Sequence, residues 1–231
     1  MATYYDRFTG GINCGSYLDV LNVSTNAESV VTDIAGGWHT YAGSWSVPGI
    51  YCSLGYIENG VEHSLANDTG FSFSGSGDKE FMSVASPFTR QASERTITLY
   101  CYLRASINGS TREAQAEYTF GVPHLPGAPT SLTATRISDN RIDLSWTNPS
   151  LDYGGFYLQV SIDGGSWSNA WSVENVMPTS YSYTAASAGH SYKFRAYTVH
   201  WYAYSAYSNE TATISMTPSA PQSISVAASG G

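Results

Sequence analysis

Short segments in the C-terminal half of this chain alternate strictly between apolar and polar residues, and this pattern constrains the fold most. Two such segments hold apolar residues at every second position: Ile142, Leu144 and Trp146, then Phe156, Leu158 and Val160. A period of two places one set of side chains on one face of a strand, so each segment is predicted to be a half-buried β-strand. Asp163-Gly164-Gly165 follows with residue types that favour a tight hairpin turn. These residues therefore predict antiparallel strands packed around a core.

Several motifs follow one another in a fixed order from residue 126 onward: Pro126-Gly-Ala-Pro129, Leu132-Thr-Ala-Thr135, Ile142-Asp-Leu-Ser-Trp146, Ser191-Tyr192-Lys-Phe194 and Ile214-Ser-Met-Thr-Pro218. In this order they resemble a complete fibronectin type III module over residues 129–218. The resemblance implies a sandwich of two antiparallel sheets, with Trp146 in the core and Tyr192 as a tyrosine corner whose hydroxyl bonds to the backbone. It also implies a spacer or display scaffold without intrinsic catalysis.

Length and composition leave room for a second β-domain before this module. The chain has 231 residues, of which 42% are hydrophobic and only 12% are charged. No segment shows a sustained 3.6-residue apolar period, whereas strand-like segments and turns alternate through residues 36–122. We therefore predict an all-β fold of two consecutive β-sandwiches, the first immunoglobulin-like over 36–122. A Pro-rich linker over 123–128 is predicted to hold the two domains end to end.

The two ends of the chain are predicted to lie outside these sandwiches. Residues 1–35 show weak strand patterns and are predicted to form an N-terminal arm. Near the other end, Pro218-Ser-Ala-Pro221 repeats the opening Pro126-Gly-Ala-Pro129 about one module length later. Residues 219–231 are therefore predicted to be a linker and the start of a further repeat. The alternative is a tail that only resembles a linker.

The chain contains an odd number of cysteines, Cys14, Cys52 and Cys101. Cys52 and Cys101 lie in strand-like segments, and their separation is compatible with an inter-sheet disulfide of the immunoglobulin kind. The alternative is that both are buried free thiols acting as small hydrophobic residues. The first residues lack the layout of an export signal, which favours the free thiols.

The sequence contains no pattern that indicates catalysis, a metal or a cofactor. Its five His lack metal-ligand spacing, and no Cys-x-x-Cys pair exists. The net charge of −8 and the absence of a basic stripe argue against nucleic-acid binding. No apolar run is long enough to cross a bilayer as a helix. We predict a non-enzymatic protein with no catalytic residues, metal site, cofactor, nucleic-acid partner or membrane insertion.

Two groups of aromatic residues predict contacts with other molecules. One falls where the resemblance places the loop between the last two strands of the module. Aromatic side chains give large contact areas at low entropy cost and stack on sugars, so these are predicted to contact a protein or glycan partner: Trp201, Tyr202 and Tyr204. The alternative is that Trp201 and Tyr202 fold back over the sandwich. The second group lies in the predicted arm and would gain most by burial on a neighbouring subunit: Tyr4, Tyr5, Phe8, Tyr17 and Leu18.

Extracellular-type modules without an export signal predict a structural protein of a virion, folded in the host cytoplasm and exposed later on the particle. The layout resembles tail, baseplate and capsid proteins of tailed bacteriophages that carry fibronectin-like and immunoglobulin-like modules. The resemblance implies that the first domain assembles with other virion proteins and with copies of itself. The module would then project toward a host-surface glycan or protein. The alternative is a secreted bacterial accessory or carbohydrate-binding spacer protein, or a fragment of a modular carbohydrate-active enzyme.

Overall fold

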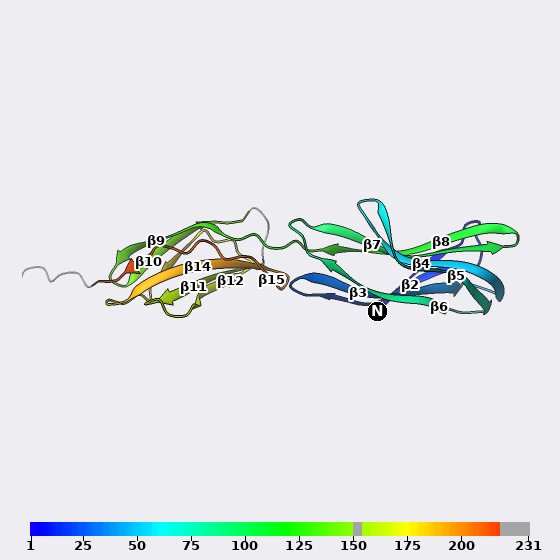
Figure 1. Cartoon of the computed structure of the whole chain (residues 1–231), viewed down its shortest axis with the longest axis horizontal. Coiled ribbons are helices and arrows are strands. Elements are labelled where there is room, and N and C mark those ends of the chain that lie inside the picture. Colours follow the sequence, from blue (N-terminus) through cyan, green and yellow to red (C-terminus); the bar gives the residue numbers. More distant parts are fainter. Residues whose placement is uncertain (150–153, 218–231) are drawn as a thin grey trace, which may run out of the picture. The chain divides into compact units, whose positions relative to one another are not determined.

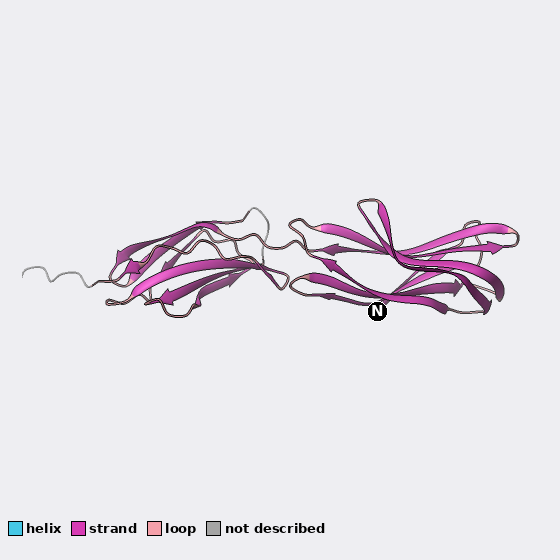
Figure 2. Cartoon of the chain, in the orientation of Figure 1, coloured by secondary structure: helices cyan, strands magenta, loops and turns pink. Residues whose placement is uncertain are grey.

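The computed structural model describes residues 1–149 and 154–217, which divide into two compact units, Met1–Leu125 and Pro126–Gly231. Every regular element of the described residues is a β-strand (Figure 2). These residues include no helix that is long and apolar enough to cross a membrane. The predicted all-β fold of consecutive β-sandwiches is confirmed. The further repeat predicted for residues 219–231 lies outside the described residues.

The first unit is a sandwich of two antiparallel sheets (Figure 1), with strand orders β1-β2-β3-β6 and β5-β4-β7-β8. Its strands are β1 Ala2–Arg7, β2 Cys14–Thr25, β3 Ser29–Thr40, β4 Trp45–Glu58, β5 Val61–Gly75, β6 Lys79–Thr89, β7 Arg95–Ile107 and β8 Ser110–Val122. Two prolines in these strands lie where no backbone N–H is needed for pairing. Pro87 lies in the edge strand β6, and Pro48 lies where the pairing of β4 is interrupted between Val47 and Ile50.

The prediction that residues 1–35 form a separate arm is wrong, because they supply β1, β2 and the first half of β3 in the first sheet. β1 pairs with β2, where Tyr5 lies opposite Tyr17, and β2 pairs with β3, where Leu18 lies opposite Gly36. Most of the first half of β2 is buried. A strand covered on both faces has no apolar–polar alternation, and the pattern that identifies half-buried strands therefore fails there.

β1 and β2 also protect the edge of the opposite sheet. The backbone N–H of Gln115 in β8 donates a hydrogen bond to the Asp6 carboxylate, with N and O 2.8 Å apart. The neighbouring N–H of Ala116 donates to Ser16 Oγ at 3.0 Å. These contacts attach β8 to the first sheet and leave fewer backbone donors free for pairing with another strand.

The core of the first unit explains why it contains no inter-sheet disulfide. Cys52 and Cys101 lie on the adjacent strands β4 and β7 of one sheet, and both are buried free thiols, as is Cys14. The residue that approaches Cys101 from the other sheet is Gly36, where an added Cβ would lie 2.6 Å from the Cys101 sulfur. The disulfide interpretation is therefore wrong, and the free-thiol alternative agrees with the structure.

The second unit repeats the strand order of the first without β1. Its sheets are β13-β10-β9 and β12-β11-β14-β15, with β16 also paired to β14. These correspond in order to β6-β3-β2 and β5-β4-β7-β8. Its strands are β9 Thr130–Ser138, β10 Arg141–Thr147, β11 Gly155–Ile162, β12 Ser168–Glu174, β13 Ser180–Tyr183, β14 Ser191–His200, β15 Ala203–Tyr204 and β16 Ile214–Ser215. Both units therefore have the strand order of an immunoglobulin-like sandwich.

Two residues predicted to define the second sandwich occupy their expected places. The ring of Trp146 is buried and stacks on Phe156, with centroids 4.4 Å apart. The hydroxyl of Tyr192 accepts a hydrogen bond from the backbone N–H of Ser187 at 2.9 Å. That bond ties the crossing between two strands to the core, as a tyrosine corner does.

Candidate functional site

A hairpin at the end of β14 holds the aromatic residues predicted to contact a partner. Val199 lies opposite Tyr204 and His200 opposite Ala203, so Trp201 and Tyr202 form a two-residue turn. Both residues have positive φ angles, 46° and 69°. Two left-handed residues in a two-residue loop are the pattern of a type I′ turn, which normally selects Asn-Gly.

The aromatic side chains of the turn and of Tyr204 are not covered by the sandwich. Trp201 is 62% exposed, Tyr202 69% and Tyr204 65%. The alternative that Trp201 and Tyr202 fold back over the sandwich is therefore wrong. A left-handed conformation costs an L-residue about 1–2 kcal/mol, and here no burial offsets that cost. Uncompensated strain of this kind is concentrated at sites that bind other molecules.

Tyrosines on the outer face of the adjoining sheet extend the exposed hairpin into a larger surface. Tyr157 and Tyr197 stack with centroids 5.1 Å apart, and Tyr197 meets Tyr204 at 5.9 Å and Tyr207 at 5.5 Å. Burial, and then the neighbouring phenols, raise the pKa of Tyr197, so its ring stays uncharged at neutral pH. We call these residues the aromatic surface: Tyr157, Tyr197, Trp201, Tyr202, Tyr204 and Tyr207.

One arginine fixes the border of the aromatic surface. The guanidinium of Arg195 lies 3.7 Å from the ring centroid of Tyr207 and 4.4 Å from that of Trp167. Its Nε donates to Gln159 Oε1 at 2.8 Å. Sequence reasoning missed this part of the surface. The available signal was that Arg195 and Tyr197 alternate with Phe194, Ala196 and Thr198, which face inward.

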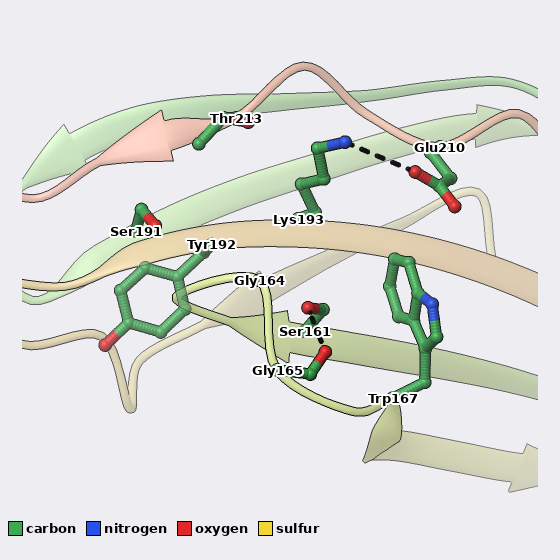
Figure 3. A pocket seen from close by; sticks show the side chains of 9 residues that line it. All are labelled: Ser161, Gly164, Gly165, Trp167, Ser191, Tyr192, Lys193, Glu210 and Thr213. Atoms are coloured by element: carbon green, nitrogen blue, oxygen red, sulfur yellow. Dashed lines mark hydrogen bonds and ion pairs between the residues drawn. The ribbon is translucent and has the colours of Figure 1, made fainter.

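A hollow of about 250 Å³ lies beside Trp167 on the same unit (Figure 3). Its charged groups pair with each other, since Lys193 Nζ lies 3.4 Å from Glu210 Oε2. The Ser161 hydroxyl donates to the Gly165 carbonyl at 2.7 Å. A nucleophile needs a hydrogen-bonded base, and Ser161 has a carbonyl instead. The Ser161 hydroxyl is therefore not hydrogen-bonded to a base that could activate it.

Two histidine–carboxylate pairs resemble part of a catalytic triad. His39 Nδ1 lies 2.5 Å from Asp78 Oδ1, and His190 Nδ1 lies 2.6 Å from Asp163 Oδ2. Among the described residues, neither ring hydrogen-bonds to a hydroxyl or thiol, which a triad requires. Within either unit, the described residues also contain no group of three side chains placed to share a metal ion. The predicted lack of activity, metal and cofactor remains a prediction.

The residues predicted to form assembly contacts differ in their burial. Phe8, Tyr17 and Leu18 are buried in the first unit, and Tyr4 is half-buried against Tyr118, with ring centroids 4.9 Å apart. Only Tyr5 is largely exposed, at 47%. The prediction is therefore wrong for the three buried residues, because intramolecular strands already cover them.

Comparison with known proteins supports a family for the second unit. The model of the fibronectin type III domain matches residues 127–214. No curated protein matches this chain. A two-domain fibronectin type III segment of chicken tenascin is 15% identical, with 85% of this chain and 97% of that structure covered and a TM-score of 0.39.

Two kinase-region structures are also similar. Titin kinase with its flanking domains is 17% identical over 39% of this chain, with a TM-score of 0.35. The twitchin kinase region of C. elegans is 24% identical over 40% of this chain, with a TM-score of 0.37. The match spans only 17% of the length of each of these structures. Such low scores carry no argument about function. The family match, the strand order and the tyrosine corner together show that residues 127–214 form a fibronectin type III domain.

Proposed function

We propose that this chain is a non-enzymatic structural protein of a virion, as in the tail or baseplate of a tailed bacteriophage. In this proposal the first unit assembles with other virion proteins and copies of itself, and the fibronectin type III domain is displayed. The observation that carries the display role is the β14–β15 turn, which holds Trp201 and Tyr202 exposed in a left-handed conformation. Fibronectin type III domains are generally non-catalytic modules, which supports a binding role over an enzymatic one.

The aromatic surface is suited to a weak contact that is repeated on one particle. Its rings are large, rigid and uncharged, so they can pack on a protein or stack on a glycan of the host surface at low entropy cost. Copies on a symmetric particle would bind the same cell together, and the effective concentration would then raise the overall affinity without new contacts.

The cysteines support folding in a reducing compartment, such as the cytoplasm of a host cell. All three are free and almost completely buried. Thiols persist without pairing where glutathione and thioredoxin keep them reduced, whereas oxidising compartments favour disulfides. This supports the virion over the alternative of a secreted accessory or spacer protein.

Detection of the chain in purified particles tests the assignment to a virion. An antibody raised against the fibronectin type III domain should label particles after density-gradient purification. The chain itself should co-sediment with the other structural proteins of the particle. If the chain is found only in the culture medium, free of particles, the alternative of a secreted spacer protein replaces the proposal.

Adsorption of particles to host cells tests the display role separately. Alanine at Trp201, Tyr202 and Tyr204 together should slow adsorption and leave particle yield unchanged. The matched control is Ile137→Ala, because Ile137 is 53% exposed in the same domain but lies outside the aromatic surface. Equal adsorption by both variants would show that the aromatic surface does not contact the host.

A further inference from the structure

A groove on the first unit is lined by aromatic and polar side chains that lie outside the aromatic surface and have no part in the proposed display role. It measures about 600 Å³ and lies on the outer face of the sheet β5-β4-β7-β8. We call it the tyrosine groove and define it by six lining residues: Tyr51, Glu62, Tyr100, Tyr102, Arg104 and Gln115. Leu99, Cys101 and Leu103 of β7 are buried in the core. The residues between them therefore face outward.

Strand pairing brings the tyrosine groove together from residues far apart in the sequence. Across β4 and β7, Tyr51 lies opposite Arg104, Ser53 opposite Tyr102 and Gly55 opposite Tyr100. Across β7 and β8, Tyr102 lies opposite Gln115. Directly opposite residues of an antiparallel pair share one face, so these side chains form neighbouring rows over the central strands.

The floor of the groove depends on a glycine. Tyr100 is only 4% exposed, and a Cβ added to Gly55 would lie 2.5 Å from its hydroxyl oxygen. The missing side chain at Gly55 therefore lets the Tyr100 ring lie against the sheet. The rings of Tyr51 and Tyr102 are half-buried, with centroids 6.0 Å apart and planes inclined by 66°. The result is a hollow with aromatic surface on its floor and side.

The polar groups of the groove offer both hydrogen-bond donors and acceptors. Glu113 lies within reach of the Tyr102 hydroxyl, and Ser53 within reach of the Tyr100 hydroxyl. Arg104 lies 5.3 Å from the ring centroid of Tyr51. Burial is the main cause that raises the pKa of Tyr102 to about 12, so the hydroxyl keeps its proton at neutral pH and can donate a hydrogen bond to Glu113, which leaves the phenol oxygen as an acceptor.

The charges of the lining exclude some ligand classes. One guanidinium, from Arg104, and one carboxylate, from Glu62, line the groove, so the lining carries no net charge. A phosphate or polyanion would need a cluster of cations. A peptide strand would be held best at a sheet edge, whereas this groove lies over β4 and β7, which have neighbours on both sides.

We propose that the tyrosine groove binds a neutral saccharide chain. The apolar faces of sugar rings would pack on Tyr51 and Tyr102, above the buried Tyr100, and the sugar hydroxyls would exchange hydrogen bonds with Glu62, Arg104 and Gln115. Ligand sites are generally lined by aromatic and apolar side chains, with a few polar groups that fix the orientation of the ligand. This inference concerns the first unit and does not depend on the virion proposal or on the aromatic surface.

The test uses the purified full chain and two kinds of probe. Neutral oligosaccharides built from glucose, mannose, galactose or N-acetylglucosamine are titrated by calorimetry, and dextran sulfate serves as a charged polymer. At least one neutral probe should bind with a Kd of about 1 mM or lower. Binding of dextran sulfate alone, or of no neutral probe at this level, would overturn the proposal. A capsular or cell-wall polysaccharide of a host can then be compared with the free oligosaccharide to identify the source.

Variants locate the binding. Tyr51→Ala and Tyr102→Ala should each weaken binding about tenfold, because each removes a ring face. Tyr51→Phe keeps the ring and should retain binding, and Arg104→Gln should weaken it without touching the core. Tyr41→Ala is the matched control, since Tyr41 is a half-buried tyrosine outside the groove. Binding that is lost equally in the control, or unchanged in the groove variants, would contradict the assignment of the site.

Discussion

Trp146 is a large aromatic side chain in the core of the second unit. Its ring stacks on Phe156 with planes inclined by 11°, and its indole N–H donates to Asn148 Oδ1 at 3.2 Å. Trp146→Ala would remove this stack and leave a cavity, so we expect a loss of about 3–5 kcal/mol in the free energy of unfolding. Calorimetry of the full chain should show one transition at lower temperature and the transition of the first unit unchanged.

The control for this prediction is Trp201→Ala, which removes the same side chain from an exposed turn. Its effect should stay within about 0.5 kcal/mol, as for most surface substitutions. If the two variants are equally stable, Trp146 is not the core residue that its burial indicates.

Buried ionisable groups predict a loss of stability at alkaline pH. Burial raises the pKa of the Cys14 thiol from 9.0 to about 12, and the pKa of Tyr102 rises from 10.0 to about 12. Above their ordinary values these groups lose protons in the unfolded chain but keep them in the folded protein. Stability is therefore complete below about pH 9 and falls as the pH rises toward about 12.

Denaturant midpoints measured between neutral pH and about pH 11 check this prediction. The midpoint should fall progressively above about pH 9 and recover when the sample is returned to neutral pH, which separates titration from chemical damage. A midpoint that is constant over this range would show that the thiol and phenol ionise equally in both states.

At the scale of one element, the turn of the β14–β15 hairpin is expected to lower the stability of its domain, because Trp201 and Tyr202 are left-handed and exposed. The double substitution Trp201→Asn and Tyr202→Gly would install the residues that a type I′ turn prefers. Relief of the left-handed conformation should raise the free energy of unfolding of the fibronectin type III domain by about 1–2 kcal/mol. Thermal unfolding measures the gain.

The same double variant should lose contact with the partner of the aromatic surface while it gains stability. An opposite pair of effects cannot be explained by damage to the fold. If the double variant is less stable than the unmodified protein, Trp201 and Tyr202 make stabilising contacts although they are exposed.

For the whole molecule, the two units are predicted to respond differently to truncation. Residues 1–35 include Phe8, Leu18 and Ile34, which are buried in the first core. Their deletion should unfold the first unit rather than merely prevent assembly, because it removes β1, β2 and half of β3. Deletion of residues 126–231 should leave the first unit folded, since the two units have separate cores.

Circular dichroism and amide exchange of both truncated chains measure these outcomes. Retention of a cooperative fold after removal of residues 1–35 would show that the first sheet does not need its N-terminal strands. That result would restore the interpretation of these residues as a separate arm.

The sequence by itself determined the features that depend on neighbouring residues. Alternation identified β10 and β11, and Asp163-Gly164 identified the turn after β11, because the faces of a strand and the φ angles of a turn are local properties. The ordered motifs predicted the core position of Trp146 and the bond of Tyr192. Residue types and the resemblance to a known module predicted that Trp201, Tyr202 and Tyr204 contact a partner, but they left open whether Trp201 and Tyr202 fold back over the sandwich. The structure decided that all three are exposed.

Only the tertiary structure decided the features that depend on which strands pair. The first half of β2 is covered on both faces and so has no alternation that a sequence could reveal. Cys52 and Cys101 are in one sheet, with Gly36 facing Cys101, because of pairings between distant segments. The tyrosine groove likewise joins residues from four strands. Long-range pairing is set by the packing of the whole core, and local periodicity does not contain that information.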